Sequence, residues 1–127
     1  MIGLVMRDAH FPGRAPIDAY GKGGFRFAEM SHLGSLLCVP SGIYGWAPRT
    51  ADDIVPAALE QVFSEAGDID VLLLGVGEMP FPLHDAAATA LRSKTIRFDT
   101  MTTGAAVRTF NVMVAEERRV AAALIAV

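Results

Sequence analysis

Cysteine is nearly absent from this sequence: Cys38 is the only one, so no intrachain disulfide can form. A chain without disulfides suits a reducing compartment. Long apolar runs are missing as well, because stretches such as 120–127 fall far short of the roughly 20 residues that a membrane-spanning helix needs. The first ten residues show neither an export signal nor an Arg-rich presequence. These absences predict a soluble, cytoplasmic, prokaryotic protein with no direct membrane span.

Charge of one sign is also scarce, since 11 basic and 14 acidic side chains give a formal net charge of −3. A nucleic-acid-binding protein usually offers a basic patch to the phosphates, so we expect no nucleic acid. His10, His32 and His84 lie far apart and lack metal-ligand spacing. We therefore expect no metal and no cofactor. Cys38 has no basic neighbour to activate it and is expected to be a buried thiol.

Hydrophobic residues, by contrast, make up 52% of the 127 residues. That proportion argues against disorder, and the length suits one domain with a real core. The mean hydropathy of +0.37 is high for a small monomer. It leaves room for an exposed apolar surface that meets a partner.

Strands and helices are predicted to alternate after an initial β segment, which is typical of a layered α/β fold. Short apolar runs between Gly and Pro predict strands at 25–27, 36–39 and 43–46. Thr50 and Asp53 form a capping-box pattern that predicts a helix ending at Gly67. Its buried face is expected to carry Ile54, Val55, Ala58, Leu59, Val62 and Phe63.

The second half of the chain contains a predicted βαβ unit. Residues 71–74 are all apolar, as in a strand that is covered on both faces. A helix over 82–92 and a strand over 95–98 follow, and the two strands should be parallel neighbours. A third helix begins near Thr103, whereas periodicity leaves 120–127 open between strand and helix.

Ligands in open α/β sheets bind beyond the carboxyl ends of parallel strands, which here places one crevice next to the predicted βαβ unit. Its candidate residues are Gly75, Gly77, Glu78, Asp99, Thr100 and Thr103. The glycines alone are a weak phosphate signal, and a tight turn is the simpler interpretation. Glu78 and Asp99 are more simply explained as solvated carboxylates or helix caps. No catalytic residue is predicted.

Four further polar or aromatic residues have two interpretations each. Asn111 lies on the apolar stripe of the third helix, where it either pins the helix to a neighbouring loop or contacts a ligand. Trp46, like Tyr44, is either a core anchor or part of an interface. Arg118 is expected on the surface, although it could also line a partner surface.

Several of these segments carry a family resemblance: IDAYGKGGFRF from Ile17, Trp46, VLLLGVGE from Val71, and FDTMTTGAAVRTFNVMVAEERRVAAALI from Phe98. Over nearly the whole chain the sequence resembles the family of mitochondrial complex I assembly factor 3 and the adipogenesis-associated Mth-domain-containing proteins, as a prokaryotic member. The resemblance implies a single Mth-like α/β domain over 1–127. That domain has three layers: a central mixed β-sheet with flanking helices, plus an additional N-terminal β segment.

The resemblance also resolves the chain end as a strand from near Val120. The family pattern maps onto Asp99, Thr100, Thr109, Phe110, Asn111, Glu116 or Glu117, and Arg118 or Arg119. Val107 stands where many members have cysteine, which argues against thiol chemistry there.

In function, the resemblance implies a non-enzymatic protein-binding or assembly factor for respiratory complex I or another membrane-associated complex. Such a factor would be a monomer or weak homodimer, peripheral to the membrane through its partner. The candidate partner surface is Tyr44, Trp46, Arg118 and Arg119. The alternative is a small-molecule binding protein or unassigned enzyme that uses the crevice at the strands ending near Leu74 and Phe98.

Overall fold

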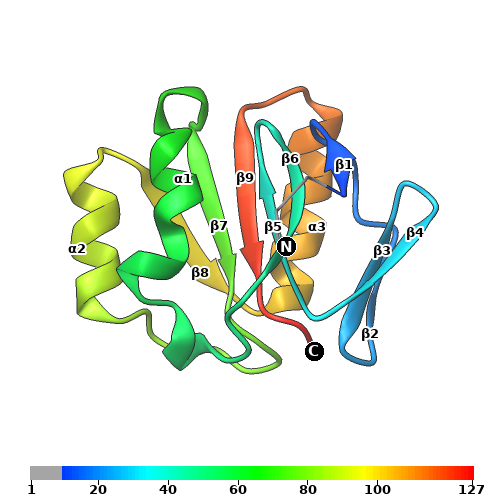
Figure 1. Ribbon diagram of the computed structural model, residues 1–127, viewed down its shortest axis with the longest axis horizontal. Helices are drawn as coiled ribbons and strands as arrows, with labels where there is room; N and C mark the ends of the chain where they lie inside the picture. The colour runs from blue at the N-terminus through cyan, green and yellow to red at the C-terminus, as the bar shows by residue number, and fades with distance from the viewer. Residues whose placement is uncertain (1–9) are drawn as a thin grey trace, which may run out of the picture.

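A six-stranded mixed sheet with the order β1-β6-β5-β9-β7-β8 runs through the middle of the computed structural model, which describes residues 10–127 (Figure 1). A smaller sheet has the order β2-β3-β4. The strands are β1 Phe11–Pro12, β2 Ala19–Gly21, β3 Gly24–Phe27, β4 Met30–Leu33, β5 Ser35–Val39, β6 Gly42–Trp46, β7 Val71–Gly75, β8 Arg97–Met101 and β9 Val120–Leu124. The α-helices are α1 Glu60–Ser64, α2 Asp85–Ser93 and α3 Thr103–Ala115, and the 3₁₀ turns are η1 Ala51–Asp53, η2 Pro56–Leu59 and η3 Ala66–Asp68.

β9 is the strand that joins the two halves of the large sheet. It pairs with β7 in parallel and with β5 in antiparallel orientation. All five of its residues are buried, as expected for a strand covered on both faces. The alternative of a strand from Val120 is thereby confirmed, and so is the prediction that β7 and β8 are parallel neighbours.

Helices cover both faces of the sheet, which gives the three layers that were predicted. α1 and α2 pack on one face, where Leu72, Leu74 and Ala123 belong to the same apolar cluster. α3 packs on the other face, where Leu73, Ala122 and Phe110 meet. The alternation along β7 follows from the period of two in a strand.

The small sheet is the additional N-terminal β segment, and it lies beside the end of the large sheet that is remote from α2 (Figure 1). Phe25 and Phe27 point from β3 into the cluster that contains Phe110. Its free face carries Leu33, which is 82% exposed. One face of the small sheet therefore packs into the core, and the other face is exposed to solvent.

The helix predicted to run from Thr50 is wrong in its first half, because the chain forms two short 3₁₀ turns before α1. Val55 is extended, at φ −107° and ψ 166°. The proline that follows at position 56 disfavours the helical conformation for Val55 and lacks an N–H to donate. Ile54, Leu59 and Val62 are buried as predicted, whereas Val55 is 40% exposed.

Two other boundaries differ from their predictions. α2 begins at Asp85, so Pro82 belongs to the preceding loop. The strand predicted over 95–98 runs instead over Arg97–Met101, because Thr95 has a left-handed φ of 59° and Ile96 still donates its N–H to Leu91 O. Asp99 and Thr100 consequently lie within the strand rather than in a loop after it.

Thr103, the first residue of α3, is a fully buried polar residue that connects three elements. Its Oγ1 donates to Ile125 O at 2.7 Å and accepts the N–H of Gly77 at 3.1 Å. Its own N–H donates to Gly77 O at 2.9 Å. One side chain thus joins the end of β9, the loop after β7 and the start of α3.

We expect Thr103→Val to lower the free energy of unfolding by about 2–4 kcal/mol, because the part-buried N–H of Gly77 and the buried carbonyl of Ile125 lose their hydroxyl partner. Thr103→Ser keeps the hydroxyl and loses only a buried methyl group, which costs about 1 kcal/mol. Urea unfolding followed by circular dichroism measures both. Equal losses for the two variants would contradict the role of the hydroxyl.

His32 links the small sheet to the large one. Its ring lies 5.0 Å from the ring of His10, and its Nε2 lies 3.0 Å from Ser35 O. Partial burial lowers the pKa of His32, the hydrogen bond to Ser35 opposes this in part, and the charge of His10 adds to the lowering. The folded state therefore holds this proton less tightly than the unfolded state.

The pKa of His32 is lower in the folded than in the unfolded state. The contribution of neutral His32 to the free energy of unfolding should therefore be fully present above about pH 6.5, and it should be lost as the pH falls through the folded pKa. We expect His32→Gln to reduce the loss of unfolding free energy between pH 7.5 and pH 5, a range above the titration of most carboxylates. Urea unfolding at the two pH values tests this. An equal loss of unfolding free energy in His32→Gln and in the parent would contradict a contribution of His32 to the pH dependence.

Candidate functional site

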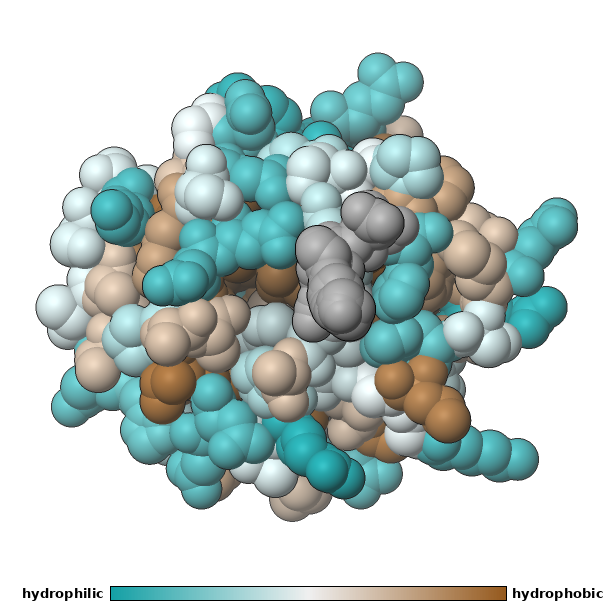
Figure 2. Space-filling model, in the orientation of Figure 1, coloured by the Kyte–Doolittle hydropathy of each residue, from teal (hydrophilic) through white to brown (hydrophobic). Residues whose placement is uncertain are grey.

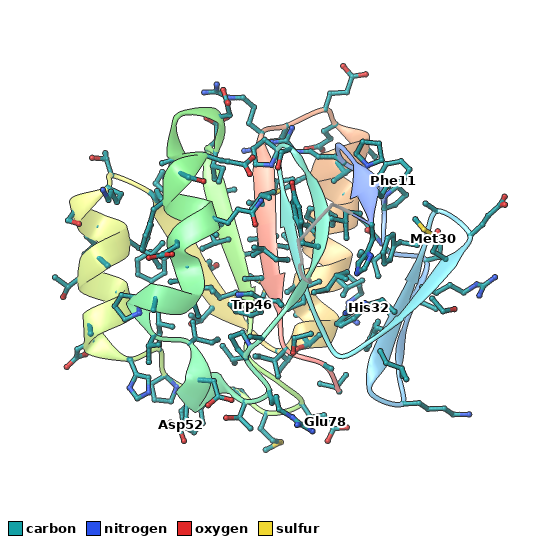
Figure 3. All side chains as sticks on the ribbon, in the orientation of Figure 1. Phe11, Met30, His32, Trp46, Asp52 and Glu78 are labelled. Atoms are coloured by element: carbon teal, nitrogen blue, oxygen red, sulfur yellow. The ribbon has the colours of Figure 1, made fainter. Side chains whose placement is uncertain are left out.

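A cavity of about 420 Å³ opens at the end of the molecule where β7 and β9 finish. Asp52 and Glu78 both lie at this end (Figure 3). The lining residues of this strand-end cavity are 49–52, 76–79, 81 and 125–127. The cavity thus takes in the loop after β7, the turn before α1 and the segment after β9, as the rule for parallel strands predicts.

Two smaller hollows adjoin the strand-end cavity. One, of about 340 Å³, shares Gly77 and Glu78 with it and reaches Tyr20 and Arg108. The other, of about 320 Å³, shares Phe81 and adds Thr100. The end of the sheet is therefore a continuous furrowed surface with polar groups on the α3 side and apolar groups on the α2 side.

The loop after β7 carries apolar side chains out into solvent. Met79 is 73% exposed and Phe81 is 44% exposed. Pro80 and Pro82 alternate with them, so the loop has few backbone N–H groups and restricted φ angles. Large exposed apolar side chains next to a cavity are characteristic of interaction sites. On the face shown in Figure 2, brown apolar atoms also reach the surface below α1 and beside the small sheet.

The turn before α1 forms the charged rim of the strand-end cavity. The Asp53 carboxylate accepts the N–H groups of Arg49 and Thr50 at 3.0 and 3.1 Å, and these hydrogen bonds lower the pKa of Asp53. Asp52 is held from the other side, since its carbonyl lies 2.8 Å from His84 Nε2. The rim is thus held by hydrogen bonds within its own turn and by a hydrogen bond to the loop before α2.

Among the predicted crevice residues, Gly77 and Glu78 line the strand-end cavity and Thr100 lines its neighbour. Gly75 does not. A Cβ on Gly75 would lie 3.0 Å from Thr103 Cα and 3.0 Å from Leu124 Cδ2. The glycine therefore allows the start of α3 to pack closely on β7 and does not contact a ligand. Thr103 is buried and occupied by its bonds to Gly77 and Ile125.

Asp99 lies outside the strand-end cavity. It is exposed on β8, and its neighbour Thr100 points to the opposite face of the sheet, since successive side chains of a strand alternate. Glu78 and Asp99 therefore belong to different surfaces.

Thr109 and Asn111 lie along α3, away from its first turn. Thr109 Oγ1 donates to Ala105 O within the helix. Asn111 Oδ1 accepts the N–H of Ile17 and its Nδ2 donates to Ile17 O, both at 2.8 Å. This two-bond clamp is the arrangement expected if Asn111 pins the helix to a neighbouring segment.

The four residues of the candidate partner surface lie in two places. Tyr44 and Arg119 both approach the connection between α1 and β7: Tyr44 reaches Glu65 through Ser41, and Arg119 pairs with Asp70 at 2.9 Å. Arg118 follows α3 at the same end and pairs with Glu116 at 3.7 Å. Trp46 ends β6 and donates its indole N–H to Ala58 O at 2.8 Å.

Cys38 is 2% exposed on β5, and burial raises the pKa of its thiol, so the predicted core role is confirmed. Across residues 10–127, no three His, Cys, Asp or Glu side chains group together as metal ligands. In the same range no helix has the length and apolarity to cross a membrane.

Sequence reasoning missed Met79, Phe81, Arg49 and Asp52, as well as the segment after β9. One usable signal was present in the run Met79-Pro80-Phe81-Pro82, because apolar residues between prolines can enter neither a helix nor an inner strand. The contribution of 125–127 depends on the pairing of β9 with β7, which no local pattern encodes.

Known proteins similar to this chain agree with the fold. An uncharacterized protein of Rhodobacter capsulatus is 37% identical over 122 residues, which are 96% of this chain and 93% of that protein. The crystal structure of a Bartonella henselae protein described as an outer membrane protein superposes with a TM-score of 0.86 at 55% identity, over 92% of this chain and 98% of that one.

A named relative comes from zebrafish, Danio rerio: NADH dehydrogenase [ubiquinone] 1 alpha subcomplex assembly factor 3. It is 30% identical over 109 residues, which are 86% of this chain but only 63% of the relative. A family model described as "Protein of unknown function (DUF498/DUF598)" matches residues 17–125. This chain therefore belongs to the DUF498/DUF598 family, which agrees with the resemblance found in its sequence.

Proposed function

We propose that this chain is a non-enzymatic protein-binding factor that helps to assemble a membrane-associated complex, respiratory complex I where its host has one. The support from relatives is the zebrafish protein, whose name states complex I assembly, together with further vertebrate and insect proteins of the same name. Those proteins are longer than this chain, so the shared domain is the part to which the proposal applies.

The observation that carries the proposal is the exposed apolar loop at the strand-end cavity. Met79 and Phe81 present large side chains to solvent, with the cavity directly beside them. Burying one such side chain in a partner is worth about 1.5–3 kcal/mol, so two of them are a substantial anchor. The cavity can in turn receive an apolar side chain of the partner.

A charged border surrounds this apolar centre. Arg49, Asp52 and Glu78 belong to the lining of the strand-end cavity. Protein interfaces commonly have an apolar core and a polar rim, and the rim selects the partner more than it binds it. The mixed signs favour a partner segment that carries both charges around an apolar residue.

Two of the predicted crevice residues are occupied by structural hydrogen bonds. Thr103 is bonded to Ile125 and Gly77, and Asn111 is bonded twice to Ile17. Glu78, which is exposed, has room to contact a partner. This distribution supports recognition rather than catalysis as the role of the site.

A small ligand is the second candidate occupant, and the volume of the strand-end cavity is the observation that favours it. About 420 Å³ falls in the range of small-molecule sites, and the position beyond parallel strands is the usual one. Native mass spectrometry of the purified protein distinguishes the two functions, since a co-purifying small mass would favour the ligand.

We expect Met79→Ser with Phe81→Ser to reduce the capture of partner proteins by about tenfold, because two apolar anchors are lost. The chain is tagged at its own locus, crosslinked, purified in mild detergent, and its partners are quantified by mass spectrometry. Leu33→Ser is the matched control, since Leu33 is also a large apolar residue and is 82% exposed on the small sheet. All these variants should fold, because the side chains are exposed.

Membrane-complex subunits that depend on Met79 and Phe81 but not on Leu33 would support the proposal. The double variant Arg118→Ala/Arg119→Ala tests, in the same experiment, the two arginines of the candidate partner surface. A partner set that is identical in the parent and in the Met79/Phe81 variant would refute the strand-end cavity as the partner site.

A further inference from the structure

The two edges of the large sheet differ sharply. β1 closes one edge with two residues, and one of them, Pro12, has no N–H to offer. β8 forms the other edge with five residues and no proline or glycine. β8 pairs with β7 on one side, and within residues 10–127 no strand pairs with its other side. A long open edge of this kind is a template for another strand.

The side chains of β8 carry opposite charges on one face. Arg97 and Asp99 are two residues apart, so both point to the α3 side of the sheet, and both are exposed. The ion pairs found among residues 10–127 include neither of them. Phe98 lies between them on the other face, half-buried, with the Arg92 guanidinium 5.6 Å from its ring centre.

We propose that β8 is a self-association edge, on which β8 of a second copy of this chain pairs in antiparallel orientation with Phe98 opposite Phe98. In this register Arg97 of each copy lies opposite Asp99 of the other. Directly opposed residues of antiparallel strands point to the same face, with Cβ atoms about 4.5–5.5 Å apart. The two-fold symmetry therefore creates two Arg–Asp pairs from one strand sequence.

Charge selects this register over its neighbours. Centring the pair on Asp99 puts two carboxylates opposite each other, and centring it on Arg97 puts two guanidinium groups opposite each other. Like charges that are directly opposed destabilise a strand pair, whereas opposite charges stabilise it. A strand with two charges of the same sign would repel its copy in all three registers, so the Arg97/Asp99 combination is what makes self-pairing specific.

A second copy fits this edge better than an unrelated strand does, because the complementary charges come from the edge itself. The contact is short, so the association should be weak and visible only at high concentration. It leaves the strand-end cavity open, since Arg97 and Asp99 do not line that cavity. Self-association at β8 is therefore compatible with an occupied strand-end cavity.

Charge reversal tests the pairing. Sedimentation equilibrium of the parent chain, from low micromolar to about 1 mM, should show a reversible dimer. Asp99→Arg alone and Arg97→Asp alone should each weaken the dimer by about tenfold, because each places like charges opposite each other twice. A mixture of these two variants should form a heterodimer again, since Arg97 and the new arginine then face two aspartates.

Asp18→Arg is the matched control, because it makes the same charge change at an exposed residue next to the small sheet. It should dimerise like the parent, and circular dichroism should show that all variants are folded. A parent chain that stays monomeric up to about 1 mM overturns the proposal. So does a dimer that Asp99→Arg leaves unchanged, or a pair of single variants that fails to associate on mixing.

Discussion

The hydroxyl of Thr103 forms the hydrogen bonds on which the strand-end cavity depends. It is fully buried, and it connects the chain at Ile125 with the chain at Gly77. Both segments leave the sheet at this point, and both line the strand-end cavity. If they were free to separate, the loop with Met79 and Phe81 would have no fixed direction. The interaction thus converts two strand ends and a helix start into one rigid base.

Close packing makes this contact possible. Gly75 has no side chain where the start of α3 crosses β7, and a Cβ there would meet Thr103 Cα at 3.0 Å. The middle of β9 is three alanines, Ala121–Ala123, which keeps the sheet thin under its helices. Farther along α3, Asn111 clamps Ile17 with two hydrogen bonds. α3 is therefore fixed at its start to the large sheet and near its end to the segment that leads into the small one.

Much of this architecture could be predicted because the signals are local. The apolar run 71–74 and the start of α3 at Thr103 are confirmed by β7 and α3. Local signals were not sufficient at Val55 and Thr95, where the backbone conformation interrupts a predicted element. The proline after Val55 could have predicted the first interruption, because it disfavours the helical conformation for the residue before it. The strand-end cavity was predictable in place but not in composition. The exposure of Met79 and the position of Ile125 beside the end of β7 depend on contacts between segments about 50 residues apart in sequence.

Rigidity at the strand-end cavity bears on how tightly the domain can bind a partner. A flexible apolar loop loses conformational entropy when it binds, and each ordered side chain costs about 0.5–1.5 kcal/mol. Here prolines alternate with Met79 and Phe81, Gly77 is hydrogen-bonded to Thr103 through both its N–H and its carbonyl, and Asp53 fixes the opposite rim. The backbone part of that cost is therefore met during folding rather than binding. A small domain can therefore hold a partner through few contacts, and release from it requires no unfolding of the site.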